Sequence, residues 1–165
     1  MVVKMKKNLL NFIETNMEKL DFDGNLEVSW QKKQHTFTLD LTFYAENKAQ
    51  EVILDMQEVE SDEPIISFVD SILLYDRTKF DPKNVQSDYL VCLPFEGKKG
   101  WTLAQGKAFF TYLQIVLDNG ESDLLDFLNN KEADIFELEW SNEEYEKVLK
   151  SIEDGQTKRL LYPQY

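Results

Sequence analysis

The stretch that decides the fold is the run Thr36-Phe37-Thr38-Leu39-Asp40-Leu41-Thr42-Phe43. Polar and apolar side chains alternate at every position, which is typical of a β-strand with one buried and one solvated face. A strand of this kind needs neighbouring strands beside it and a second layer over its apolar face. The run therefore predicts a sheet that is packed on one side.

The same reasoning predicts the elements around this strand. Alternation or continuous apolar character indicates further strands at residues 26–30, 52–56, 65–75, 89–95 and 135–140. Apolar side chains at three- and four-residue steps, together with capping residues, indicate helices at 6–20, 102–117, 122–128 and 141–152. We expect Asn119 and Gly120 to end the second of these helices.

The order of these elements defines the fold class. Most of the strands follow one another with short links, and short links favour antiparallel pairing. No repeat, low-complexity tract or interdomain linker divides residues 1–165. The sequence predicts one α+β domain, with a single antiparallel sheet of about five to six strands and helices packed mainly on one face.

The charge of the chain is strongly acidic. It has 31 Asp and Glu against 18 Lys and Arg among 165 residues, so its net charge is −13. Nucleic acid and anionic membranes both attract clustered Lys and Arg, so we expect neither to bind directly. No stretch approaches the roughly 20 apolar residues of a membrane-spanning helix, and no signal region is evident. With Cys92 as its single cysteine, the chain is expected to be cytoplasmic.

The residues for conventional catalysis are scarce. His35 is the single histidine, and histidine is the side chain that titrates near neutral pH without a large shift. We interpret His35 as a partly exposed turn residue and Cys92 as a buried, unreactive thiol within an apolar strand. The sequence therefore favours a protein that is not an enzyme, and it predicts no catalytic residue.

Carboxylates supply the alternative to this interpretation. Asp40, Asp55 and Asp70 alternate with or interrupt apolar strand residues, so a small carboxylate-dependent enzyme would use them if they converged. Residues 21–24 and 118–123 resemble calcium loops superficially, but neither has the spacing of an EF-hand. We expect no metal and no cofactor.

The charges are segregated along the chain. Residues 51–63 carry six acidic side chains and no basic one, and residues 118–146 carry eleven acidic side chains against Lys131. Residues 77–107 are relatively basic and include Lys107. The predicted interaction surface consists of Arg77, Lys79, Lys83, Lys98, Lys99, Tyr162 and Tyr165.

The carboxyl-terminal residues 159–165 are unusually apolar for the end of a chain. They include two leucines and two tyrosines, which should bury against something. Docking onto the chain's own sheet is the favoured interpretation, and strand addition to a partner or to a second copy is the alternative.

Four motifs occur in one order along the chain. They are Asp88-Tyr89-Leu90-Val91-Cys92-Leu93-Pro94-Phe95-Glu96-Gly97-Lys98-Lys99-Gly100, Ser122-Asp123-Leu124-Leu125-Asp126-Phe127-Leu128, Phe136-Glu137-Leu138-Glu139-Trp140 and Tyr162-Pro163-Gln164-Tyr165. With them the chain resembles a domain-of-unknown-function family, family 3013, of small acidic proteins from lactic-acid bacteria and related Gram-positive bacteria. The resemblance implies a bacterial, cytoplasmic, single-domain protein and no established activity, cofactor or catalytic residue.

Charge segregation and the lack of catalytic residues lead to one functional hypothesis. We interpret the chain as a non-catalytic protein-binding or adaptor module whose partner has a basic surface. The alternatives are a small carboxylate-dependent enzyme and an acidic mimic of nucleic acid. The sequence leaves the oligomeric state open.

Overall fold

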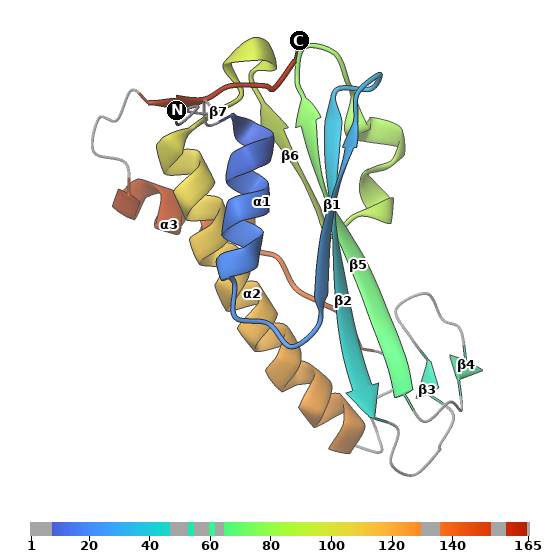
Figure 1. Ribbon diagram of the computed structural model, residues 1–165. Helices are drawn as coiled ribbons and strands as arrows, with labels where there is room; N and C mark the ends of the chain where they lie inside the picture. The colour runs from blue at the N-terminus through green and yellow to red at the C-terminus, as the bar shows by residue number, and fades with distance from the viewer. Residues whose placement is uncertain are drawn as a thin grey trace, which may run out of the picture.

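The computed structural model describes residues 8–46, 53–54, 60–61, 65–129, 136–152 and 158–164 (Figure 1). The helices are α1 (Leu9–Lys19), α2 (Leu103–Asn129) and α3 (Asn142–Ile152), with the 3₁₀ turns η1 (Pro82–Asn84), η2 (Gln86–Asp88) and η3 (Gly97–Lys99). The strands are β1 (Asn25–Gln31), β2 (Thr36–Glu46), β3 (Ile53–Leu54), β4 (Glu60–Ser61), β5 (Ile65–Asp76), β6 (Val91–Phe95), β7 (Trp101–Thr102) and β8 (Arg159–Leu160).

The main sheet has the strand order β1-β2-β5-β6. β2 pairs antiparallel with both of its neighbours, so Phe37 lies opposite Trp30 on one side and Leu74 on the other. β5 and β6 pair in parallel, because the connection through η1 and η2 returns the chain to the same end of the sheet. The α+β class is confirmed. The described sheet is mixed and four-stranded, and β3–β4 and β7–β8 form two separate pairs where one antiparallel sheet was expected.

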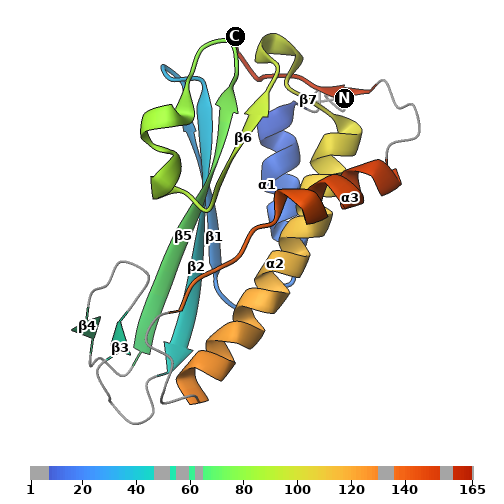
Figure 2. The same ribbon diagram turned by 180° about the vertical axis from the view of Figure 1, so that it is seen from behind.

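The helices cover one face of the main sheet, as predicted (Figures 1 and 2). The alternation in β2 places Phe37, Leu39, Leu41 and Phe43 on that face, and each is at most 1% exposed. α1 and α2 run along the face, and α3 crosses α2 (Figure 2). Apolar side chains of α2 complete the core: Ala108, Phe109, Leu113, Val116 and Leu117.

Helix α2 is a single helix of 27 residues, so the predicted stop at Asn119 and Gly120 is wrong. It begins directly after Thr102, as expected, and the Thr102 Oγ1 accepts from Gln105 N at 3.0 Å while Gln105 Oε1 accepts from Thr102 N at 2.8 Å. Gly120 does not end the helix but allows neighbouring side chains to pack closely against it. A Cβ there would lie 2.5 Å from a Leu138 methyl and about 3.0 Å from the Phe43 ring.

The strand predicted at residues 135–140 is also wrong for its described part, because residues 136–140 pair with no described strand. Their side chains nevertheless alternate between buried and exposed. Phe136 packs against the rings of Phe43 and Phe68, at centroid distances of 5.9 and 5.3 Å. The side chains of this segment therefore alternate because the segment packs between α2 and the sheet, and not because it pairs with a neighbouring strand.

The carboxyl-terminal tail, which we define as residues 158–164, docks onto the chain's own fold. β8 pairs antiparallel with β7, and Leu9 N donates to Leu161 O at 2.8 Å. The neighbouring side chain of Tyr162 is 6% exposed. This agrees with the favoured interpretation of the tail, although the tail pairs with β7 and not with an edge of the main sheet.

Among the described helices, none combines the length and the apolar character needed to cross a membrane.

Substitution of Gly120 tests the packing of α2. In an exposed helix interior, replacing Gly with Ala stabilises by about 1 kcal/mol. Here the added methyl group collides with Leu138 and Phe43, so we expect Gly120→Ala to lower the free energy of unfolding measured with urea. Asn119→Ala, at the exposed neighbouring position, should leave it unchanged or raise it slightly. A gain in stability for Gly120→Ala would contradict the packing described here.

Candidate functional site

A groove lined by acidic side chains lies between α2 and residues 138–144. Its volume is about 770 Å³. Asp123, Glu139 and Glu144 line it, and the described lining includes no Lys or Arg. The apolar part of the lining consists of Leu90, Tyr112, Val116, Leu138 and Trp140. We call this site the acidic groove.

Aromatic packing and backbone hydrogen bonds fix one wall of the acidic groove. The Trp140 ring stands edge-on to Tyr112 at a centroid distance of 4.7 Å. Tyr112 Oη accepts from Ser141 N at 3.0 Å, and Ser141 Oγ accepts from Glu144 N at 3.2 Å, which caps α3 as predicted. The backbone that carries Glu139 and Glu144 is therefore positioned before any ligand binds.

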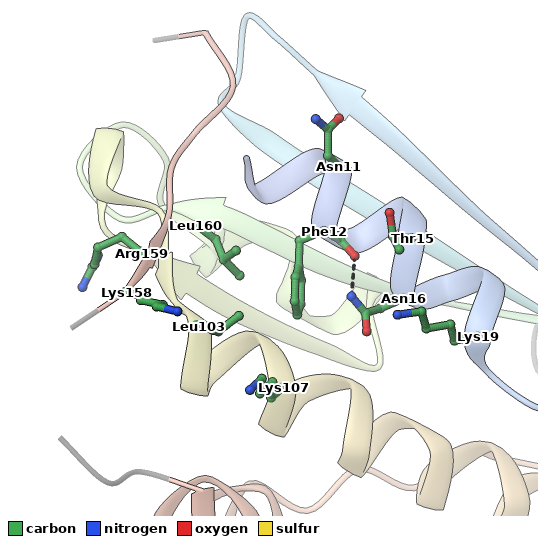
Figure 3. Close-up of a pocket in the computed structure, with 10 residues that line it drawn as sticks. All are labelled: Asn11, Phe12, Thr15, Asn16, Lys19, Leu103, Lys107, Lys158, Arg159 and Leu160. Carbon is green, nitrogen blue, oxygen red and sulfur yellow. Dashed lines mark hydrogen bonds between the residues drawn. The ribbon is translucent and has the colours of Figure 1, made fainter. Parts of the chain in front are cut away.

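A second hollow has the opposite charge. It lies between α1, the start of α2 and the beginning of the tail, and its volume is about 580 Å³ (Figure 3). Four basic side chains line it: Lys19, Lys107, Lys158 and Arg159. The rest of the lining consists of Asn11, Phe12, Thr15, Asn16, Leu103 and Leu160, so the described lining includes no carboxylate. We call this site the basic pocket.

The tail forms one side of the basic pocket. Leu103 N donates to Lys158 O at 2.9 Å, which holds the tail against the start of α2. Arg159 donates from Nε to Lys99 O at 3.0 Å and from Nη2 to Gly100 O at 3.3 Å. Its guanidinium therefore supports the η3 turn, and the three lysines supply the other positive charges of the pocket.

His35 forms a third cluster at the end of the main sheet. Its Nδ1 lies 3.3 Å from Oδ2 of Asp76, a carboxylate with 0% exposure. Asp76 Oδ1 accepts from both the backbone and the hydroxyl of Thr78, at 2.9 and 2.7 Å. The backbone of His35 has a φ of 58°, a left-handed conformation that is uncommon for residues other than glycine. His35 therefore lies in a turn and is partly exposed, as expected, and it is in addition the partner of a buried acid.

The His35 ring also holds the tail. It stacks on Tyr162 with a centroid distance of 5.0 Å and an interplanar angle of 4°. Tyr162 Oη accepts from Trp30 Nε1 at 2.7 Å, and Phe95 stacks on the same ring. A histidine–aspartate pair can orient a catalytic base, but His35 and Asp76 line neither hollow described above. Here Asp76 contacts the His35 ring, and that ring packs against Tyr162 of the tail.

Comparison with known proteins identifies the family. The model of the family described as protein of unknown function (DUF3013) matches residues 4–164. The chain belongs to this family. It is similar to a solved structure, the crystal structure of a conserved protein of unknown function from Enterococcus faecalis. The two are 34% identical, the TM-score is 0.84, and the match covers 99% of this chain and 100% of the other. Comparison with curated proteins gives no match.

The predicted carboxylate site does not assemble from the two aspartates that the structure describes. Asp40 lies on the outer face of the sheet, where its Oδ1 accepts from Ser71 Oγ at 2.6 Å. Asp70 lies on the helix-covered face, opposite Leu41. Burial raises the pKa of Asp70, a bond from the Ser71 amide opposes this, and nearby Glu137 adds to the rise. Asp55 lies outside the described residues.

The environment of Cys92 agrees with an unreactive thiol. Cys92 is partly buried, and burial raises the pKa of its thiol. A higher pKa leaves less thiolate at neutral pH, which makes the sulfur a poorer nucleophile.

The predicted interaction surface is exposed at its five basic residues but not at Tyr162. Lys83, Lys98 and Lys99 are exposed. Arg77 forms an exposed ion pair with Glu96 at 2.7 Å, and Lys79 is also exposed. Tyr162 does not belong to this surface, because its ring is 6% exposed and packs in the core. Tyr165 lies outside the described residues.

The two calcium-like loops lie side by side without forming a metal site. Gln114 Nε2 donates to Asp21 O and to Asp118 Oδ1, at 2.8 and 2.9 Å. Asp23 N donates to Glu121 Oε1 at 3.4 Å. In the part of the chain that the structure describes, no group of three His, Cys, Asp or Glu side chains could hold a metal ion.

The sequence indicates the acidic groove but not the basic pocket. The acidic run 118–146 contains the three carboxylates of the acidic groove, so its composition already indicated an acidic side. The basic pocket was missed because its lysines come from three distant segments, and only Lys107 falls in the basic region noted above. No local pattern in the sequence connects Lys19 with Lys158.

Glu121 provides a test of the electrostatics. Burial raises its pKa most, the Asp23 amide opposes this, and the charges of Asp23, Asp118 and Asp21 add to the rise. Because its folded-state pKa exceeds the unfolded one, ionised Glu121 opposes folding at neutral pH, and this effect vanishes once the carboxyl is protonated in both states. We therefore expect Glu121→Gln to raise stability at pH 7 but not at about pH 3.

Glu146→Gln, at an exposed site on α3, is the matched control because it changes the net charge equally. Urea unfolding at both pH values measures the difference. An equal gain in the free energy of unfolding for both variants at pH 7 would contradict this prediction. It would show that removing any one negative charge from the acidic chain has the same effect.

Proposed function

We propose that this protein is a non-catalytic binding module that receives a basic segment of a protein partner in the acidic groove. The observation that carries the proposal is the set of three carboxylates, Asp123, Glu139 and Glu144, beside the apolar side chains of the groove. Of these apolar side chains, which we call the floor, Leu90 and Trp140 are partly exposed. A partner segment with Lys or Arg beside a large apolar side chain complements both features.

Charge complementarity supports a basic occupant. Carboxylates at the rim of a groove raise the rate of encounter with a positive partner and make binding sensitive to salt. Glu144 also pairs with Lys147 at 3.2 Å. Both side chains of that pair are more than half exposed, and such surface pairs contribute little energy, so a partner cation can replace Lys147 at small cost.

The floor of the groove supports a protein segment over mimicry of nucleic acid. A mimic needs carboxylates that reproduce the regular spacing of phosphates along a helix. The acidic groove instead combines carboxylates with aromatic rings, among them the half-buried indole of Trp140. An indole face attracts Lys and Arg through cation–π interaction, worth about 0.5–1 kcal/mol at an exposed site.

Two features support the non-catalytic and cytoplasmic parts of the proposal. Asp40 and Asp70 lie on opposite faces of the sheet, and His35 pairs with Asp76 beneath the tail. Cys92 is a free thiol, which fits a reducing compartment.

Peptide binding tests the proposal. The probe is a fluorescein-labelled nonapeptide of alternating Arg and Leu, and an Arg–Ser nonapeptide of equal charge controls for the apolar floor. By fluorescence anisotropy at low salt, we expect the Arg–Leu peptide to bind more tightly. Asp123→Asn, Glu139→Gln and Glu144→Gln combined should weaken that binding by about tenfold or more, since each lost charged contact is worth about a kcal/mol or more.

The matched control replaces three exposed glutamates outside the groove with Gln: Glu14, Glu27 and Glu146. It has the same net charge as the groove variant and should bind within about threefold of the unchanged protein. Equal weakening by the two variants, or equal affinity for the two peptides, would refute the proposal.

A further inference from the structure

The basic pocket carries a second inference, independent of the partner at the acidic groove. We propose that it binds a small amphipathic anion, a carboxylate or a phosphate ester joined to an apolar group. The evidence is the combination of positive charge, apolar floor and size in one hollow (Figure 3).

The charge of the basic pocket is opposite in sign to the net charge of the chain. The protein has a net charge of −13, yet four basic side chains and no carboxylate line this hollow among the described residues. Lys19, Lys107 and Lys158 form no ion pair with a described acidic side chain. An anion placed among them is attracted by all three, whereas without it they repel one another.

The floor of the pocket is apolar and tightly packed. Phe12 and Leu160 are 9% and 3% exposed, and Leu103 lies beside them. Gly106 allows this packing, because a Cβ there would lie 2.6 Å from the Phe12 ring and 2.8 Å from a Leu160 methyl. Asn16 Nδ2 donates to Phe12 O at 2.9 Å, which keeps the Asn16 side chain beside the floor (Figure 3). An apolar group of the ligand would rest against these side chains.

Size and global charge favour a small molecule over a macromolecule. The volume of about 580 Å³ lies within the range of about 300–1,000 Å³ of small-molecule sites. An acidic protein would bring many negative charges near a chain of net charge −13 and would be repelled as a whole. A ligand with one anionic group meets the local lysines with far less repulsion.

The first experiment is a fluorescence titration with 8-anilinonaphthalene-1-sulfonate, an amphipathic anion that becomes bright in an apolar site. Its neutral counterpart N-phenyl-1-naphthylamine controls for apolar binding alone. We expect the anion to bind more tightly, and Lys19→Gln with Lys107→Gln to weaken it by about tenfold or more, because charge-assisted contacts are lost. The affinity for the neutral dye should stay within about twofold.

The matched control is Lys33→Gln with Lys83→Gln, two exposed lysines outside the pocket. It has the same net charge and should bind the anionic dye within about twofold of the unchanged protein. Circular dichroism verifies that each variant is folded, since unfolded or loosened chains also bind this dye. Equal weakening by both double variants, or equal affinity for the two dyes, would overturn the proposal.

Displacement of the bound dye then identifies the anionic group. Decanoate carries a carboxylate and phenyl phosphate carries a phosphate, and both have an apolar part. Displacement by either one supports the proposal and assigns the corresponding head group. Displacement by neither, at concentrations up to the millimolar range, would contradict it.

Discussion

The last residues of the chain join parts of the fold that are far apart in sequence. Three backbone hydrogen bonds make the connection: Leu9 N to Leu161 O, Leu103 N to Lys158 O and Tyr162 N to Lys98 O. The Tyr162 ring then packs against Phe37, Phe95 and His35 at the end of the main sheet. Because backbone groups that leave water must be paired and large rings bury much apolar area, the tail ties the starts of α1 and α2 to the sheet.

This constraint also positions the two hollows. The tail supplies Lys158, Arg159 and Leu160 to the basic pocket, so that pocket exists only while the tail is docked. The acidic groove is built on α2, and the segment that forms its wall is held by Trp140 and Tyr112. Helix α2 lines both hollows, so one rigid element separates sites of opposite charge. Such a field can steer a cation and an anion to different places on one small domain.

The sequence predicted the helices and strands whose apolar side chains all lie on one face of the element. The alternation from Thr36 to Phe43 identified β2, the spacing in α1 identified a helix, and Ser141 identified the start of α3. Local patterns failed where tertiary packing decided the outcome. Gly120 continues a helix because Leu138 and Phe43 need the space of its missing side chain. Residues 136–140 imitate a strand because they lie between α2 and the sheet.

The sites were harder to predict than the fold, for a physical reason. A run of acidic residues remains acidic wherever it folds, so the acidic side was visible in the sequence. The basic pocket needs the tail to meet α1, and the stacking of His35 needs it to meet Tyr162, in both cases across more than a hundred positions, which no local pattern records. The most direct test of the role of the tail is the free energy of unfolding of two variants at neighbouring tail positions. Tyr162→Ala removes a ring that is 6% exposed, and Leu161→Ala removes a side chain that is 52% exposed. We expect urea unfolding to show that the free energy of unfolding falls by about 3–5 kcal/mol for Tyr162→Ala and by under about 1 kcal/mol for Leu161→Ala. Equal, small losses for both would contradict this expectation.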